Sequence, residues 1–254
     1  MRSKHHEHRS GLVQRYFDRV YNPVYDLTTG RLNRYRTLQQ LCVDRLMFKD
    51  NDTILCVGIG TGNEVSHILR KNRSVDIVGV DYSAIALRKA RRKALALGRQ
   101  IEGLIMDARQ LDFPSASFDH VLCVHFMDYV AEKDIVTGEI LRVLRNKGQF
   151  AITYPSDSEG VALGLDLLKD GIHDKVSSGK GRLRAFAESL AELLAGILYF
   201  PLLLRRKNSC SHKELVALFS ELTRGPFQIE EYSVYHDFIV SGRKTNEEGK
   251  ANAG

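Results

Sequence analysis

The stretch that decides the fold is residues 54–64, which read Ile-Leu-Cys-Val-Gly-Ile-Gly-Thr-Gly-Asn-Glu. It opens with a short apolar run of the kind that forms a buried strand, and the run ends in glycines. Glycines at such a point let the backbone turn sharply and lie close to a ligand, where a side chain would collide. A helix that follows offers free N–H groups to the same ligand. The stretch therefore predicts a binding loop between a strand and a helix.

The spacing of the glycines narrows the ligand. A dinucleotide fingerprint, Gly-x-Gly-x-x-Gly, needs glycine at position 63, which is Asn63. A phosphate-binding P-loop needs Gly-Lys followed by Ser or Thr, and no lysine follows the glycines. The pattern here is Gly-x-Gly-x-Gly, which indicates a different ligand.

Strand and helix patterns alternate outward from this loop. Over about a hundred residues such alternation predicts a mostly parallel sheet wrapped by helices. Two final strands are joined too closely for a helical crossover, so they predict an antiparallel hairpin. The expected strands are 53–57, 75–80, 101–106, 118–124, 149–154, 227–234 and 237–242, and the expected helices are 63–71, 83–97 and 135–144, the last closed by a turn at 146–148.

The rest of the chain suggests four further segments. Residues 1–10 and 245–254 are polar and are predicted to be disordered tails. Residues 11–48 predict an N-terminal helical lid segment, and 49–244 predict the main domain, with a helical insertion at about 156–224.

Acidic and basic side chains follow successive strands of the predicted sheet. Asp81 ends the second strand, Asp107 follows the third and His125 follows the fourth. In an open α/β sheet, ligands bind outside the carboxyl ends of the strands. A carboxylate at position 81 can accept hydrogen bonds from both ribose hydroxyls, and one at 107 can accept a hydrogen bond from an adenine amino group. A single Asp after a strand is also a common helix cap, so the ordered set carries more weight than any member.

This order of residues resembles the class I S-adenosylmethionine-dependent methyltransferases, over about residues 50–155 and the final hairpin. The resemblance implies a Rossmann-like sheet of seven strands with an antiparallel last strand, and S-adenosyl-L-methionine as cofactor. The segment 113–119 (Phe-Pro-Ser-Ala-Ser-Phe-Asp) also resembles the link into the fourth strand of that family. The resemblance assigns cofactor binding to Gly58, Gly60, Thr61, Gly62, Asp81, Tyr82, Asp107, Ala108, His125 and Tyr16.

One position departs from the family pattern. Two residues before the first glycine the family usually has Asp or Glu, where this chain has Cys56. That acid helps to hold water or the methionyl ammonium group, so its absence affects the expected affinity and not the fold. Glu64 is the nearby acid that is placed to compensate.

The N-terminal segment has a narrower resemblance. Its stretches 16–20 (Tyr-Phe-Asp-Arg-Val), 25–26 (Tyr-Asp) and 30–36 (Gly-Arg-Leu-Asn-Arg-Tyr-Arg) are similar to the opening of ubiquinone and menaquinone C-methyltransferases and of some phospholipid N-methyltransferases. In such enzymes this segment lies over the cofactor. The resemblance implies the same position for Tyr16 and Tyr25.

Residues 183–207 form the most apolar segment of the insertion. Its uncharged stretch, 193–204, is well short of the roughly 20 residues that span a bilayer, and Pro201 interrupts any helix there. Basic residues flank it at both ends. It predicts a lid over an apolar substrate, a helix at a membrane surface, or a helix packed on the core or on a second copy in a homodimer.

Composition limits the class of protein. The chain has 254 residues, 43% hydrophobic residues and a net charge of +6, which suits a globular enzyme and does not by itself indicate an anionic partner. Four scattered cysteines indicate neither a disulfide framework nor zinc, and no metal site is predicted, since His5, His6 and His8 lie in the tail. The polar N-terminus shows no signal peptide, so we expect a cytoplasmic protein, and association with a membrane surface is the alternative.

Together these features predict a methyltransferase acting on a small hydrophobic acceptor. Catalysis would use His125 or Tyr25, with Asp128 and His173 behind them, although a histidine at 125 also suits a cofactor contact or a pocket wall. Two alternatives stay open. One is a regulatory protein that binds the cofactor without turnover. The other is a nucleic-acid methyltransferase, suggested by the basic stretch 88–93 but lacking the Asn/Asp-Pro-Pro-aromatic motif, so no nucleic-acid partner is expected.

Overall fold

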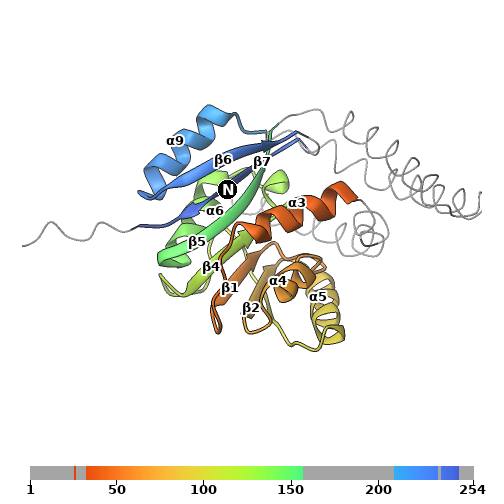
Figure 1. Cartoon of the computed structure of the whole chain (residues 1–254). Coiled ribbons are helices and arrows are strands. Elements are labelled where there is room, and N and C mark those ends of the chain that lie inside the picture. Colours follow the sequence, from red (N-terminus) through yellow and green to blue (C-terminus); the bar gives the residue numbers. More distant parts are fainter. Residues whose placement is uncertain (1–25, 27–32, 157–208, 234–235, 246–254) are drawn as a thin grey trace, which may run out of the picture.

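The computed structural model describes residues 26, 33–156, 209–233 and 236–245 (Figure 1). A seven-stranded sheet forms the centre, with strand order β3-β2-β1-β4-β5-β7-β6. The elements are α3 (Asn33–Asp44), β1 (Thr53–Val57), α4 (Val65–Lys71), β2 (Asp76–Asp81), α5 (Ala84–Ala96), β3 (Glu102–Ile105), β4 (Phe118–Cys123), the 3-10 helix η3 (Met127–Tyr129), α6 (Lys133–Val143), β5 (Leu144–Pro155), α9 (His212–Leu222), β6 (Phe227–Tyr232) and β7 (Asp237–Arg243).

The pairing of the strands confirms the predicted fold class. Strands β1 to β5 are parallel, and β1 lies between β2 and β4, with Cys56 level with both Gly79 and Leu122. Strand β7 runs antiparallel to both β5 and β6, as the short connection between the last two strands requires. The carboxyl ends of β1, β2, β3 and β4 therefore meet along one edge of the sheet.

Both faces of the sheet are covered by helices, which explains why the central strand β1 is apolar after Thr53. Ile54 and Cys56 point to the face covered by α3, α4 and α5, whereas Leu55 and Val57 point to the face covered by α6 and α9. All four side chains are at most 1% exposed.

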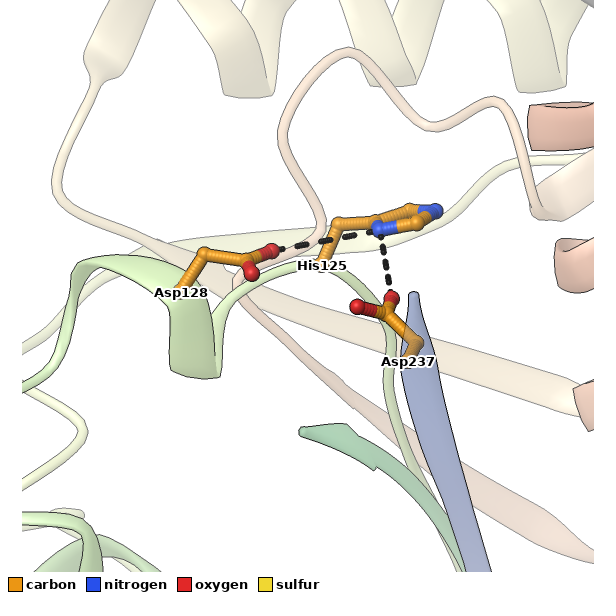
Figure 2. A group of neighbouring side chains, drawn as sticks. All are labelled: His125, Asp128 and Asp237. Carbon is orange, nitrogen blue, oxygen red and sulfur yellow. Dashed lines mark ion pairs between the residues drawn. The ribbon is translucent and has the colours of Figure 1, made fainter. Parts of the chain in front are cut away.

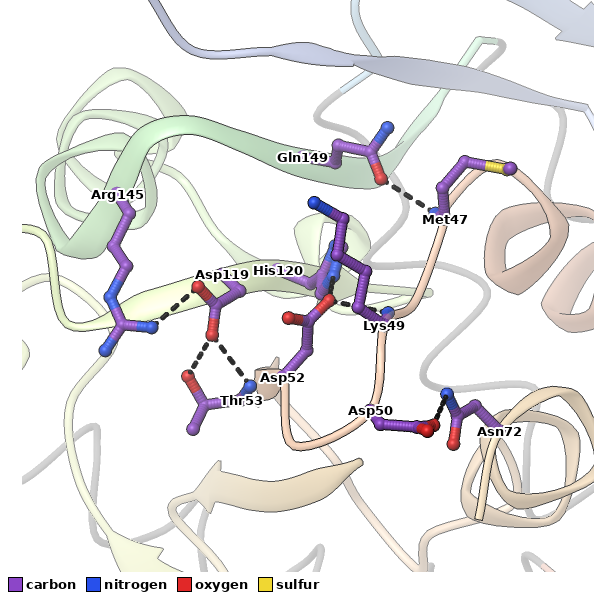
Figure 3. A network of polar contacts seen from close by, with 10 residues as sticks. All are labelled: Met47, Lys49, Asp50, Asp52, Thr53, Asn72, Asp119, His120, Arg145 and Gln149. Atoms are coloured by element: carbon purple, nitrogen blue, oxygen red, sulfur yellow. Dashed lines mark hydrogen bonds and ion pairs between the residues drawn. The ribbon is translucent and has the colours of Figure 1, made fainter. Parts of the chain in front are cut away.

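A polar network lies at the opposite edge of the sheet, where β1 begins (Figure 3). Asp119 accepts hydrogen bonds from the N–H and hydroxyl of Thr53, both at 2.9 Å, and from Arg145 at 2.6 Å. Asp52 lies 2.8 Å from His120 Nε2. These contacts tie the loop before β1 to β4 and β5, so they have a structural role away from the predicted site.

One local prediction is wrong. The residues Asn146, Lys147 and Gly148 do not close a helix, because α6 ends at Val143 and they belong to β5. Phe118 of β4 pairs with Leu144 of β5, and His120 pairs with Gln149. The residues of β5 between these two pairs outnumber those of β4, so they form a bulge. Lys147 there has φ 65°, and its N–H donates to Lys244 O at 2.8 Å. The backbone groups that we assigned to a helix end thus bind the segment after β7.

Several predicted segments lie outside the described residues: the N-terminal tail, residues 246–254 of the C-terminal tail, most of the N-terminal segment with Tyr16 and Tyr25, His173, and the apolar segment 183–207. Helix α3 falls within the predicted helical range 11–48, and α9 within the predicted insertion. Helix α9 begins with a capping box between Ser211 and Glu214. In the part of the chain that the structure describes, no helix is long and apolar enough to cross a bilayer.

Candidate cofactor and active site

The glycine loop follows β1 and is held against the end of β2. The N–H groups of Gly58 and Ile59 donate to Val80 O at 2.9 and 3.1 Å. The N–H of Gly60 donates to Asp81 Oδ2 at 2.9 Å. These bonds fix the loop along the carboxyl edge of the sheet.

The three glycines are needed for different reasons, although all have positive φ. A Cβ on Gly58 would lie 2.3 Å from the ring of Phe126, and one on Gly62 would lie 2.8 Å from Cβ of Ala90. A Cβ on Gly60 would meet nothing nearer than Gly58 O at 3.9 Å. Gly58 and Gly62 therefore allow protein packing, whereas Gly60 leaves open space beside the backbone, where a ligand can approach.

The carboxylate of Asp81 is oriented by two backbone groups. Its Oδ2 accepts from Gly60, and its Oδ1 accepts from Ser83 N–H at 2.8 Å. The N-cap of α5 is Ser83, whose hydroxyl accepts from Ala86 N–H. The helix-cap role therefore belongs to Ser83, and Asp81 is placed between the loop and the ligand edge.

The predicted adenine side of the site contains a residue that sequence reasoning missed. Arg109 Nε lies 3.1 and 3.0 Å from the two carboxylate oxygens of Asp107, and Tyr82 also hydrogen-bonds to this carboxylate. Burial raises the pKa of Asp107, but the Arg109 and Tyr82 hydrogen bonds outweigh it and leave the pKa below its ordinary value. Tyr82 is 42% exposed and Ala108 is buried. Asp107 is thus an ionised acceptor whose orientation Arg109 determines.

Thr61 contacts the N-terminal segment. Its buried hydroxyl donates to Asp26 Oδ1 at 2.7 Å, and Lys93 Nζ lies 2.6 Å from the same oxygen. Lys93 also donates to Thr61 Oγ1 at 3.0 Å and to Asn63 Oδ1 at 2.5 Å. This network links the glycine loop, α5 and residue 26. The sequence analysis grouped Asp26 with Tyr25 but gave Lys93 no role in the site, because a lysine on a basic helix is typical of a solvent-exposed face.

The departure at position 56 brings a thiol and an acid together. Cys56 and Glu64 are both buried. Burial raises the pKa of the Cys56 thiol, and the negative charge of Glu64 raises it further. Burial raises the pKa of Glu64 to about 7, although a backbone hydrogen bond and the charge of Lys93 lower it; the charge of Asp81 adds a smaller raising effect. Glu64 is thus a buried acid near position 56, where the resemblance leads us to expect Asp or Glu.

His125 is the most constrained of the predicted site residues (Figure 2). It follows β4 with φ 56°, and its N–H donates to Thr153 Oγ1 at 2.8 Å. Its ring stacks on Tyr35 of α3, with ring centroids 4.2 Å apart and an interplanar angle of 13°. Its Nδ1 lies 3.3 Å from Asp237 Oδ2 and 3.9 Å from Asp128 Oδ2.

Sequence reasoning named Asp128 but missed Tyr35 and Asp237 as neighbours of His125. The available signal for Asp237 was an acid opening an otherwise apolar strand, Asp237-Phe-Ile-Val. That acid is only 1% exposed. The available signal for Tyr35 was its place in the motif 30–36.

Comparison with known proteins agrees with this geometry. Residues 54–148 match the model of a methyltransferase domain family. The chain is 39% identical over 134 residues to a phosphatidylethanolamine N-methyltransferase of Cereibacter sphaeroides, covering 51% of this chain and 62% of the relative. It is 32% identical over 146 residues to a demethylmenaquinone methyltransferase of Thermus thermophilus, covering 56% and 66%. The chain thus spans slightly less than two thirds of the length of these relatives.

A solved structure shows the same fold. The plantazolicin methyltransferase BpumL in complex with S-adenosylhomocysteine superposes with a TM-score of 0.59 at 15% identity, covering 92% of this chain and 94% of that chain. At this identity the likeness concerns the fold alone. The family match, the sheet order and the placement of the glycine loop together confirm the prediction of the family and of its methyl donor: residues 54–148 form a class I S-adenosylmethionine-dependent methyltransferase domain.

Proposed function

We propose that the chain transfers a methyl group from S-adenosylmethionine to a small, apolar acceptor. The observation that carries this proposal is the alignment, along one sheet edge, of the glycine loop, Asp81, Asp107 and His125 at the ends of four parallel strands. Open α/β sheets bind their ligands at this edge.

The described residues fit the cofactor. Gly60 leaves open space beside its backbone, as the methionyl chain requires. Asp81 accepts two backbone hydrogen bonds and, as a carboxylate, has further acceptor capacity for ribose hydroxyls. The exposed ring of Tyr82 and the carboxylate of Asp107, whose pKa is lowered, support a role in binding an adenine base. Tyr16 and Thr61 belong to the same proposal.

When bound, the cofactor supplies a methyl group activated by a sulfonium. The task of the protein is then to align the acceptor with this methyl and to exclude water. Asp81 and Asp107 would hold the nucleoside, and the glycine loop would hold the methionyl part. His125, with Tyr25 as the other candidate, accepts the proton of the acceptor.

The acceptor class is inferred from two sources. The relatives named above act, by their names, on phosphatidylethanolamine and on demethylmenaquinone, which both carry long apolar parts. The segment 193–204 is apolar and uncharged. Both support an apolar acceptor enclosed by the insertion, or reached at a membrane surface through residues 183–207.

The test has two stages. Calorimetry should show S-adenosylhomocysteine binding and no NAD binding, and binding of NAD alone would overturn the proposal. Wild-type protein and labelled S-adenosylmethionine are then incubated with phosphatidylethanolamine vesicles, with demethylmenaquinone in detergent, and with duplex DNA as control. Labelled lipid or quinone is expected. Labelled DNA would favour the nucleic-acid alternative, and cofactor binding without transfer to any acceptor would favour the regulatory one.

A further inference from the structure

We propose that His125, Asp128 and Asp237 form a site for a divalent cation such as Zn²⁺, with Nδ1 of the histidine and an oxygen of each carboxylate as ligands. His125 follows β4, Asp128 lies in η3, and Asp237 opens β7 beside the carboxyl end of β5. Because the three are spread over residues 125–237, no local spacing indicates a metal site in the sequence. The inference goes beyond the proposed function and rests on it only for what the bound cation would do.

The candidate ligand atoms lie at the distances that one cation requires (Figure 2). Nδ1 of His125 is 3.3 Å from Asp237 Oδ2 and 3.9 Å from Asp128 Oδ2. One ligand atom from each residue lies within 4.8 Å of the other two. In a tetrahedral zinc site with nitrogen and oxygen ligands at about 2.0–2.2 Å, neighbouring ligand atoms are about 3.4 Å apart. A cation among the three side chains therefore requires only small shifts of the aspartates.

The contact between His125 and Asp237 differs from a histidine–aspartate hydrogen bond. Within the described residues neither Nδ1 nor Asp237 Oδ2 makes a hydrogen bond, although both residues have further contacts. The pair His120 and Asp52, at the other edge of the sheet, does form one, with Nε2 2.8 Å from Oδ2 (Figure 3). Nδ1 and Oδ2 of the first pair thus face each other at ligand spacing without a hydrogen bond, as two ligands of one cation do.

Burial also favours a cation at this point. The side chains of His125, Asp128 and Asp237 are 7%, 10% and 1% exposed. Buried carboxylates are paired or coordinate metals, because removing their charge from water is costly. A divalent cation would balance the charges of both carboxylates, alongside the contacts that these residues already make.

Neighbouring groups hold the imidazole so that its edge meets the carboxylates. The ring stacks on Tyr35 with centroids 4.2 Å apart, and the backbone N–H of His125 donates to Thr153 Oγ1 at 2.8 Å. Stacking covers a face of the ring and leaves the edge, where the lone pair of Nδ1 lies. Outer contacts of this kind orient the ligands of metal sites.

The donor set selects the class of cation. An imidazole nitrogen with two carboxylate oxygens suits Zn²⁺, whereas Mg²⁺ prefers oxygen ligands and keeps several waters. Three protein ligands leave a position for water or a substrate oxygen, as in catalytic zinc sites. Under the proposed function, that position would take an oxygen atom of the acceptor. With Nδ1 on the cation, the proton-accepting role would then pass from His125 to Tyr25.

Calorimetry tests whether the site exists. The full chain is used with His5, His6 and His8 replaced by Gln, so that the histidines of the tail do not bind the metal. We expect one tightly bound Zn²⁺ per chain and much weaker binding of Mg²⁺. A chain that binds no Zn²⁺, or binds Mg²⁺ equally well, would overturn the proposal.

Variants of the same chain test which residues are ligands. Asp237→Asn and His125→Gln should each weaken Zn²⁺ binding about 100-fold or more, since loss of an outer contact alone costs about 10–100-fold. Asp128→Asn, at the most exposed of the three positions, should also weaken it and serves as the second variant if Asp237→Asn does not fold. Asp52→Asn, which alters the hydrogen-bonded histidine–aspartate pair, is the matched control and should leave the affinity unchanged. Equal affinity in all variants would place the metal elsewhere.

A second readout identifies the ligand atom. Nitrogen-15 NMR of histidine-labelled protein is recorded during addition of Zn²⁺, with the His125 signals assigned by their absence in His125→Gln. Zn²⁺ should move the Nδ1 signal and leave a proton on Nε2, and Asp237→Asn should need about 100-fold more Zn²⁺ for the same change. His125 signals that Zn²⁺ leaves in place, or a metal on Nε2, would refute the proposed geometry.

Failure of this inference can be told apart from failure of the proposed function, because metal binding is measured without turnover. A chain that methylates an acceptor equally well in EDTA, and whose His125 signals ignore Zn²⁺, would refute the inference alone. A chain that binds Zn²⁺ through the three side chains but transfers no methyl group to any acceptor would refute the proposed function and leave the metal site standing.

Discussion

Asp81 and Gly60 are joined by a hydrogen bond of 2.9 Å, so the acid that ends β2 fixes the loop that follows β1. Under the proposed function the same carboxylate also receives the ribose of the cofactor. The proposal therefore makes loop geometry and ligand affinity depend on a single side chain.

Asp81→Ala should weaken binding of S-adenosylhomocysteine by about 2–4 kcal/mol, because two charge-assisted hydrogen bonds are lost. Stability should fall less, since the freed N–H groups of Gly60 and Ser83 can reach water. Calorimetry and urea denaturation measure the two effects. Asp76→Ala, on the same strand at the opposite edge, is the control and should leave affinity unchanged. A stability loss with unchanged affinity would contradict the prediction.

The two glycines 58 and 60 should respond differently to alanine. Both have positive φ, so each change costs about 1 kcal/mol of backbone strain. A Cβ at Gly58 also collides with Phe126, so Gly58→Ala should lower Tm sharply. A Cβ at Gly60 meets open space, so Gly60→Ala should keep most of its stability and lose cofactor affinity. Thermal melts and calorimetry of both variants check this, and equal melting temperatures would argue against the packing role of Gly58.

Lys93→Met should weaken the attachment of Asp26 to the glycine loop, which would then depend on the Thr61 hydroxyl. The lysine and aspartate side chains are about one third exposed, so we expect a stability loss of only about 1–2 kcal/mol. Lys89→Met is the control, because Lys89 lies 3.6 Å from the same carboxylate without the contacts to Thr61 and Asn63. Limited proteolysis near residue 26 should quicken in Lys93→Met alone. Equal behaviour of the two variants would mean that only the net charge matters.

Glu64 should make stability fall as pH rises. Its pKa is about 7 in the folded chain against an ordinary 4.5, so the unfolded chain ionises first. The contribution is fully present below pH 4.5 and is lost by about pH 7, a change of about 3 kcal/mol. Glu64→Gln should remove this pH-dependent loss, as measured by urea denaturation at pH 5 and pH 8. If the stability of Glu64→Gln fell as steeply as that of wild type between pH 5 and pH 8, the ionisation of Glu64 would not be the cause of the loss.

The apolar segment is tested by replacing Leu198 and Phe200 with Ser. If the segment encloses the acceptor site, turnover of the apolar acceptor should fall about tenfold or more while cofactor affinity stays constant. A change of oligomeric state or loss of folding would indicate core or dimer packing. Loss of liposome flotation with activity retained on a detergent-dispersed acceptor would indicate a surface anchor.

Much of the fold could be predicted from the sequence because short stretches rich in apolar residues alternate with helix patterns, and the glycines after Val57 mark the first strand end. Their bounds were predicted within about two residues, as with Thr53–Val57, apart from the start of β5. The edge positions of Asp81, Asp107 and His125 followed from the parallel order alone. The bulge in β5 could not be foreseen, because a turn-like tripeptide also suits a bulge that binds a distant strand.

The side-chain partners in the site were less predictable. Arg109 on Asp107 and Lys93 on Asp26 are contacts of long, charged side chains that composition assigns to solvent. The approach of Tyr35 and Asp237 to His125 depends on how α3 and β7 pack against the sheet. No local pattern encodes that packing.

The distance along the chain between His125 and Asp237 has a consequence for biosynthesis. The glycine loop and Asp81 are separated by a single strand–helix unit, so the nucleoside half of the site can form while much of the chain is still being made. Asp237, whose Oδ2 lies 3.3 Å from His125 Nδ1, is on β7, the last strand that the structure describes, and pairing of such distant segments is the slow part of folding. In a ribosome-bound chain that ends before β7, the glycine loop and Asp81 would therefore already be joined, whereas His125 would still lack the carboxylate of Asp237.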